Sequence, residues 1–408
     1  MELATRSAQT IVIGAGVTGL SAALHLAERG ASVMVLEREG PGLGTSGRAN
    51  GQIIAGLQQS PDAIVATYGA DPGERIVEFS GKAPDLVFDL IARHGIACNA
   101  ERSGWVQATR WTRGLKALEK LAGSWEQRGA PARMLDRQEI GEVLGTRVYA
   151  GGWLDQRNGM IQPLAYARGL ADAAARAGAA ICCGVDVTDL TRRDQQWILS
   201  TNRGELRAET VVLATNVYTS QLQGIAKALL GRTYLSAYSV QLASEPLSES
   251  QRKTLLPQRH SCGDTGHLRL RYFRLDGEGR LVIGGPGWIT PPRSASAISF
   301  CVLEHSARRM FPQLEGTRFQ YRWAARDTLT PDLLPHLYEP APGMFSALGY
   351  NGRGLAIGTA LGSVLARRVL GEAANALPYP TTDASSVPLN LPAAARFYLN
   401  LAMERWRH

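Results

Sequence analysis

The sequence predicts an α/β protein whose first domain is interleaved along the chain with a second, α+β domain built on a mixed β-sheet. A strand, a glycine turn, a helix and another strand follow one another within the first forty residues. Apolar strands and alanine-rich helices return much later, separated by segments of a different pattern. The 408 residues exceed what one ordinary core needs, which favours two domains.

The glycine turn is the most specific motif. Thr10–Ile13 is a short β-branched run that we expect to form a buried strand, and a Gly-Ala-Gly-Val-Thr-Gly sequence follows it directly. Gly14 permits a tight turn, Gly16 allows a pyrophosphate to approach the backbone, and Gly19 lets the following helix pack on the strand. The N-terminus of that helix offers unpaired N–H groups to phosphates. The motif therefore predicts a Rossmann-like dinucleotide site.

A second strand, Ser32–Leu36, completes the unit and ends at Glu37. An acid in this place can accept hydrogen bonds from a ribose diol. The motif does not choose between NAD and FAD, because both cofactors carry a pyrophosphate and an adenine-linked ribose. The predicted cofactor contacts of this unit are Gly14, Ala15, Gly16, Val17, Thr18, Gly19, Glu37 and Arg38.

Four later segments resemble the D-amino-acid-oxidase superfamily of FAD-dependent amine oxidoreductases. They are residues 44–52 (GTSGRANGQ), 159–187 (GMIQP, an alanine-rich helix and an expected strand from Ala180 to Val187), 209–216 (ETVVLATN) and 347–355 (ALGYNGRGL). The first looks most like the SGRNGGQ segment of the γ-glutamylputrescine-oxidase-like branch, although this chain has Ala-Asn-Gly in place of Asn-Gly-Gly. The last leads into a predicted helix, whose N-terminal dipole would stabilise negative charge on a reduced flavin.

The resemblance implies noncovalent FAD, since no cysteine follows Cys301 to tether the cofactor. It also implies a Rossmann-like FAD-binding domain of the glutathione-reductase type. The expected division is 1–80, 146–219 and 323–372 for the FAD-binding domain, 81–145 and 220–322 for the substrate-binding domain, and 373–408 for a C-terminal tail with a helix. The further implied FAD contacts are Thr45, Ser46, Arg48, Ala49, Asn50, Gly51, Gln52, Val187, Ala214, Thr215, Gly349, Tyr350, Asn351, Gly352, Arg353, Gly354 and Leu355.

The second domain is expected to roof the flavin. Residues 268–274 and 281–283 flank an Asp-Gly-Glu-Gly turn, which predicts a hairpin. Period-two alternation places Tyr272 and Arg274 on one face, where a guanidinium matches a substrate carboxylate, and Arg271 is the fallback. A solvent-facing arginine is the alternative. Residues 323–332 resemble a block beside the family's active site. The candidate substrate contacts are Tyr272, Arg274, Arg326, Trp323 and Tyr350, with core packing as the alternative for the last two.

The resemblance further implies oxidation of a carbon–nitrogen bond in an amine or an amino or imino acid. A hydride would pass to flavin N5, and water would hydrolyse the resulting imine, so no side-chain base is nominated. Candidate substrates are a γ-glutamyl amine, a polyamine derivative and a cyclic imino acid, with dioxygen or a respiratory acceptor taking the electrons. A non-amine or non-catalytic FAD protein on the same scaffold and an NAD-dependent dehydrogenase are the alternatives.

Composition sets the remaining expectations. The formal charge of +8 is carried by scattered arginines, so we expect no nucleic-acid partner, and no Cys or His spacing suits a metal. The N-terminus lacks an apolar signal core and no window suits a membrane helix, so we expect a cytoplasmic protein. Residues 391–408 are expected to form an amphipathic helix that packs on the FAD domain, with membrane contact as the minority alternative. The oligomeric state is left open.

Overall fold

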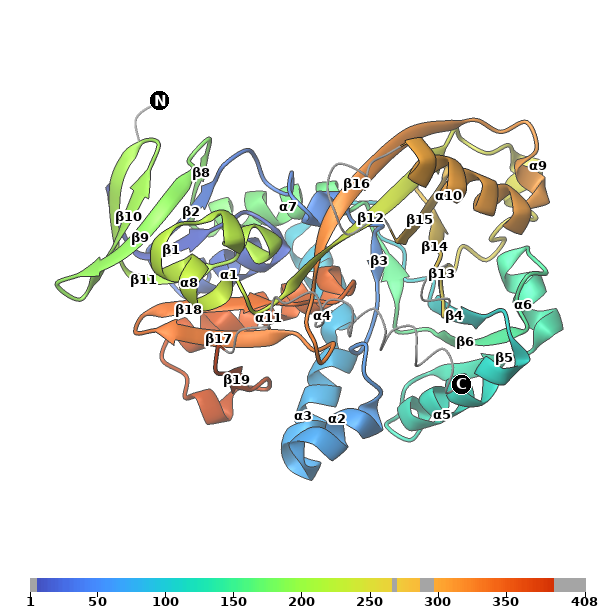
Figure 1. Ribbon diagram of the computed structural model, residues 1–408, viewed down its shortest axis with the longest axis horizontal. Helices are drawn as coiled ribbons and strands as arrows, with labels where there is room; N and C mark the ends of the chain where they lie inside the picture. The colour runs from blue at the N-terminus through green and yellow to red at the C-terminus, as the bar shows by residue number, and fades with distance from the viewer. Residues whose placement is uncertain (1–5, 266–269, 287–296, 385–408) are drawn as a thin grey trace.

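Two main β-sheets organise the computed structural model, which describes residues 6–265, 270–286 and 297–384 (Figure 1). The first sheet is made, in order, of β19 (Thr381–Thr382), β17 (His336–Ala341), β18 (Met344–Leu348), β11 (Gly204–Leu213), β1 (Ser7–Ile13), β2 (Val33–Glu37) and β8 (Ala180–Cys183), with the hairpin of β9 (Val187–Arg193) and β10 (Gln196–Thr201) attached to β11. The five strands from β18 to β8 run parallel. Their carboxyl ends therefore meet at one edge, where Gly14, Ala214 and Gly349 follow their strands.

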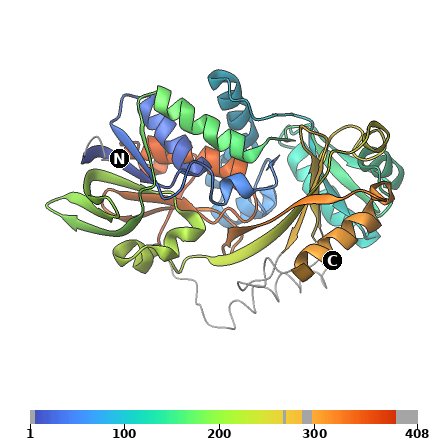
Figure 2. The same cartoon turned by 90° about the horizontal axis from the view of Figure 1, so that it is seen from above.

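Helices α1 (Val17–Ala27), α7 (Pro163–Arg176) and α11 (Gly354–Val369) pack together on one face of this sheet, as Figure 2 shows. Small residues let α1 and α11 approach closely: a Cβ on Gly362 would lie 2.5 Å from the carbonyl oxygen of Thr18. Ser21 Oγ also donates to the carbonyl of Thr359 at 2.7 Å. The last long helix of the domain is thereby fixed against the helix that begins at the glycine turn.

The second sheet is mixed. Its strands, in order, are β16 (Phe319–Leu329), β12 (Leu235–Ser244), β15 (Leu281–Pro286), β14 (Tyr272–Leu275), β13 (Ser261–Asp264), β4 (Trp105–Thr109), β6 (Gly151–Asp155) and β5 (Ala132–Leu135). Only the β13–β4 pair of this order is parallel. In Figure 1 the β12–β16 ribbon runs from the first sheet to the second. The α/β class with a second, mixed sheet is confirmed.

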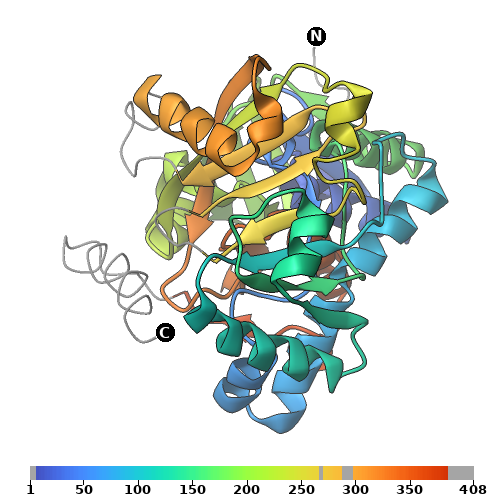
Figure 3. The ribbon, with the colours of Figure 1, turned by 90° about the vertical axis from the view of Figure 1, so that its right-hand side faces the viewer.

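The remaining elements surround these sheets. A two-stranded sheet joins β3 (Gln52–Ile53) to β7 (Gly159–Met160). The view from the side of the second sheet shows α5 (Leu115–Glu126), α6 (Arg137–Leu144) and α10 (Ala297–Met310) around it (Figure 3). The other helices and their bounds are α2 (Pro61–Tyr68), α3 (Ala70–Gly81), α4 (Ala83–His94), α8 (Gly224–Leu230) and α9 (Glu249–Arg252). No described helix is both long and apolar enough to cross a bilayer.

One sequence-based expectation differs from the structure, one is revised by a proposal, and two others lie outside the described residues. The strand expected to run from Ala180 to Val187 stops at Cys183, because Gly184 adopts a φ of +70° and Val187 starts the antiparallel β9. Strands β6 and β16 pair within the second sheet, so we propose to draw the domain boundaries after Asp155 and after Leu329. Leu268 and the expected helix at 391–408 lie outside the described residues.

The α1–α11 contact predicts a steric test. Gly362→Ala places a methyl group against the Thr18 carbonyl, so we expect the free energy of unfolding to fall by about 1–3 kcal/mol. The matched control is Gly123→Ala in α5, where a Cβ meets nothing within 4 Å. That change should stabilise the protein by about 0.5–1 kcal/mol, since alanine favours a helix. Denaturant unfolding of both variants measures the difference, and equal effects would contradict the packing described.

Candidate active site

A cavity of about 1980 Å³ opens at the carboxyl edge of the first sheet, beneath the second. It is large enough for a dinucleotide and a small substrate together. All the predicted cofactor contacts line it except Gly19 and Gly349, and among the predicted substrate contacts Tyr272, Arg326 and Tyr350 line it. Residues separated by most of the chain therefore share one cavity.

The glycine turn leaves bare backbone at the cavity wall. A Cβ on Gly14 would lie 2.8 Å from the carbonyl oxygen of Ala214, and Gly14 has a φ of +104°. Ser46 accepts a hydrogen bond from the N–H of Val17 at 3.1 Å, at the start of α1. Gly19 faces the strand, where its Cβ would lie 2.1 Å from the carbonyl oxygen of Gly14. A pyrophosphate-binding turn requires glycine at these positions, because a side chain on Gly14 or Gly19 would clash with a backbone carbonyl.

Glu37 ties the end of β2 to this turn. Its carboxylate accepts hydrogen bonds from the backbone N–H of Ala15 at 2.8 Å and of Glu39 at 3.0 Å. Each carboxylate oxygen accepts more than one hydrogen bond, so lone pairs remain for a ribose diol in the cavity. The acid is thus oriented before any ligand binds.

The loop of residues 44–52 is fastened to the second sheet. Gln52 Nε2 donates to the carbonyls of Cys262 at 2.9 Å and Phe273 at 3.2 Å, and its Oε1 accepts from Trp105 Nε1 at 3.0 Å. Asn50 Nδ2 donates to Gln241 at 3.2 Å, while Asn50 Oδ1 is buried without a protein partner. An unsatisfied acceptor in a cavity wall fits a ligand that brings an N–H group, as the flavin ring does.

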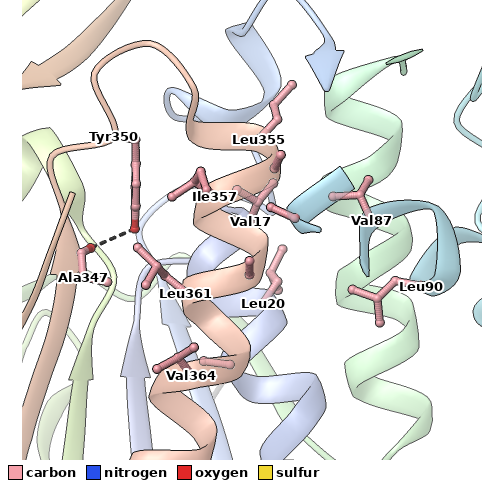
Figure 4. Close-up of a cluster of buried hydrophobic side chains, with 14 of the residues drawn as sticks. Val17, Leu20, Val87, Leu90, Ala347, Tyr350, Leu355, Ile357, Leu361 and Val364 are labelled. Atoms are coloured by element: carbon pink, nitrogen blue, oxygen red, sulfur yellow. Dashed lines mark hydrogen bonds between the residues drawn. The ribbon is translucent and has the colours of Figure 1, made fainter. Parts of the chain in front are cut away.

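The bend of residues 347–355 meets the glycine turn through Tyr350. Its hydroxyl donates to the carbonyl of Ala347 at 2.8 Å (Figure 4). The same hydroxyl lies 2.8 Å from Thr18 Oγ1. Burial raises the pKa of this hydroxyl well above its usual range. Tyr350 therefore links the bend to α1, and its hydroxyl is already hydrogen-bonded within the protein.

Two predicted substrate contacts lie outside the cavity. Arg274 is buried, and its Nε donates to the carbonyl of Asn50. Desolvation lowers its pKa to about 10. Trp323 donates from Nε1 to the carbonyl of Arg48 at 2.9 Å. Neither side chain lines the cavity, since both donate to backbone carbonyls of the 44–52 loop. The fallback Arg271 does line the cavity, where its Nε donates to Ser306 at 3.0 Å.

Two further cations line the cavity. The guanidinium of Arg326 lies over the rings of Tyr218 and Tyr238, 5.4 and 5.8 Å from their centroids. Arg353 donates to the carbonyl of Ala55 at 2.9 Å, and its guanidinium lies 5.7 Å from the Trp105 ring centroid. Desolvation lowers the pKa of Arg353 to about 10, although the group stays charged near neutral pH.

The sequence-based prediction missed Asp327. This half-buried residue of β16 lines the cavity and accepts hydrogen bonds from the backbone N–H of Thr328, at 2.8 Å, and of Gly352. Desolvation outweighs these bonds and raises the pKa of its carboxyl to about 6. Tyr272 lies nearby, and its pKa is raised to about 12 by burial and by the charge of Asp327. The sequence signal that could have indicated Asp327 was its position directly after Arg326, a predicted substrate contact.

A dinucleotide turn, an oriented ribose acid and a roofing sheet around one cavity define a nucleotide-dependent redox enzyme. The chain belongs to the DAO family of FAD-dependent oxidoreductases, whose family model matches residues 9–368. This confirms the resemblance to that family and the FAD requirement, and it sets aside the NAD-dependent alternative.

Individual relatives cover nearly the whole chain. The probable oxidoreductase OrdL of Haemophilus influenzae is 30% identical over 366 residues, which cover 90% of this chain and 83% of that protein. The γ-glutamylputrescine oxidoreductase of Escherichia coli is 29% identical over 397 residues, covering 96% and 91%. The crystal structure of glycine oxidase from Geobacillus kaustophilus has the same fold, with a TM-score of 0.77 at 23% identity, covering 93% of this chain and 99% of that one.

Loss of the Glu37 charge should weaken FAD binding. Glu37→Gln turns one acceptor oxygen into an N–H donor beside the backbone N–H groups, so we expect the Kd for FAD to rise about 10- to 100-fold. Titration of flavin-free protein with FAD, followed by flavin fluorescence, measures the change. Glu205→Gln, at the exposed start of β11, is the control and should bind as the wild type does. An unchanged Kd for both would contradict the role of Glu37.

Asp327 should make stability depend on pH. Its folded pKa exceeds that of the unfolded chain, so its contribution to stability falls as pH rises from about 4 to about 6 and is then constant. In flavin-free protein at pH 8, Asp327→Asn should raise the free energy of unfolding by about 1–2 kcal/mol, less than the full equivalent of the shift because cavity water screens the charge. At pH 4 the gain should nearly vanish. Urea unfolding at both pH values tests this, and an equal gain at both would refute the assignment.

Proposed function

We propose that this chain oxidises the carbon–nitrogen bond of an amine or amino acid with bound FAD as the hydride acceptor. The observation that carries the proposal is the shared cavity, in which the dinucleotide segments and the ionisable residues of the second sheet face one space. The names of the relatives support it, since one is a γ-glutamylputrescine oxidoreductase and another a glycine oxidase.

The protein side chains would bind and orient the substrate. Tyr272, Arg271 and Asp327 line the cavity from the second sheet, and residues 350–355 line it from the first domain, with the Gly352 N–H donating to Asp327 where the two meet. A substrate between them is held with its carbon–hydrogen bond toward the cofactor, which is the alignment that hydride transfer requires. The product imine is then hydrolysed by water that enters through the open mouth. Arg326 and Arg38 lie over the Tyr218 ring beside the pyrophosphate turn, so we assign them to the cofactor half.

The remaining expectations belong to the same proposal. FAD is held without a covalent bond, since no cysteine occurs in residues 44–52 or 347–355. Dioxygen or a respiratory acceptor reoxidises the flavin, and the protein works in the cytoplasm. The alternative of a non-catalytic FAD protein on the same scaffold predicts that no substrate reduces the flavin.

A purified sample tests the proposal directly. The protein should be yellow, acid precipitation should release FAD into the supernatant, and an anaerobic panel of amines and amino acids should bleach the flavin with at least one member. Hydrogen peroxide formed in air identifies dioxygen as the acceptor, and its absence with a dye acceptor still active favours a dehydrogenase. A flavin that no member of the panel reduces contradicts amine oxidation.

A further inference from the structure

The second sheet contributes two carboxylates to the cavity lining, Asp264 and Asp327. Asp264 is paired with Arg110 at 3.3 Å, which leaves Asp327 as the candidate to meet a substrate. Asp327 lies on β16 opposite Ala237 of β12 and beside Gly352 of the bend. A Cβ built on Gly352 would lie 3.8 Å from Asp327 Oδ2, with nothing nearer than that in the described part of the chain. The carboxylate thus stands where the roof meets the bend that faces the cofactor.

The surroundings of Asp327 do not neutralise it. Its hydrogen-bond donors are the backbone N–H groups of Thr328 and Gly352, and no ion pair joins it to another residue described by the structure. Arg326, its neighbour on β16, is occupied with Ser236 and two tyrosine rings. The ionisable group that faces it is Tyr272 from β14, which is neutral near pH 7. β12 presents no ionisable side chain opposite it, because Ala237 is its partner.

We propose that Asp327 binds the ammonium group of the substrate, so that this chain prefers a cationic amine without a carboxylate on the carbon to be oxidised. The inference rests on the proposed function and narrows its substrate class. A charge-assisted hydrogen bond from an ammonium offsets the desolvation of the buried carboxylate. A substrate carboxylate beside that ammonium would instead repel Asp327 at short range in a poorly solvated cavity.

The same carboxylate also resolves a chemical requirement. Hydride loss needs the neutral amine, so one N–H bond of the ammonium must break before oxidation. The proton passes to a carboxylate oxygen of Asp327, forming an O–H bond, and no electrons are exchanged in this step.

A matched pair of ligands tests the inference on the FAD-loaded enzyme. N-acetylputrescine and Nδ-acetylornithine differ by one carboxylate on the carbon that bears the free amine. Binding is measured under anaerobic conditions by the shift of the flavin absorption band, which reports occupancy whether or not turnover follows. We expect the wild type to bind the first compound at least about tenfold more tightly than the second.

The variants isolate the carboxylate. Asp327→Asn keeps the size of the side chain and one acceptor oxygen and removes only the charge, so FAD content should be unchanged, while N-acetylputrescine should bind at least about tenfold more weakly. Nδ-acetylornithine should lose nothing or gain. Asp194→Asn on the exposed β9–β10 turn is the matched control and should leave both affinities unchanged. If Asp327→Asn fails to retain FAD, Asp327→Glu, which keeps the charge, should retain the preference for the amine.

The outcomes separate this inference from the proposed function. A wild type that prefers Nδ-acetylornithine, binds neither compound, or keeps its preference after Asp327→Asn overturns the role of Asp327. Amine oxidation would still stand if another amine or amino acid bleaches the flavin. Conversely, selective binding of N-acetylputrescine with no bleaching by any amine supports the ammonium site and overturns the redox function.

Discussion

The contact between α1 and α11 holds the site together. Thr18 at the start of one helix and Tyr350 before the other are 332 residues apart, yet their hydroxyl oxygens lie 2.8 Å apart. Gly362 permits the backbones to approach, because any side chain there would meet the Thr18 carbonyl. Without this packing, the glycine turn and the 347–355 bend would be separate loops. They would then not form one continuous cavity wall opposite the second sheet.

The second sheet holds the 44–52 loop in place as well as lining the space for a substrate. Arg274, Trp323 and Gln241 all donate to backbone carbonyls of residues 48–50, and Gln52 donates back to the sheet. Polar side chains are needed here because a loop that lines a cavity leaves carbonyl groups with no strand to pair them. The 44–52 loop is thereby fixed against the second sheet, and fewer charged groups are left free to meet a substrate than the sequence suggests.

The electrostatics of the cavity follow from this division. Arg326 and Arg353 are occupied with aromatic rings and backbone carbonyls, and Arg271 with Ser306. Asp327 is hydrogen-bonded through backbone N–H groups alone, so its charge is oriented without being cancelled by a cation of the described chain. A cavity that also keeps an unpaired acceptor at Asn50 is arranged to receive ligands that bring N–H groups.

The sequence by itself determined the parts whose physics is local. A glycine turn between a β-branched strand and a helix, with an acid after the next strand, has one common use. Residues 14–18 and Glu37 line the cavity as that pattern predicts, whereas Gly19 packs inside. The tertiary structure alone decided which side chains reach the cavity. Alternation placed Tyr272 and Arg274 on one face, but the loop that crosses this face covers Arg274 and leaves Tyr272 open. The importance of Asp327 depends on burial and on a backbone N–H contributed by Gly352, and a contact between distant segments leaves no periodic signal in the chain.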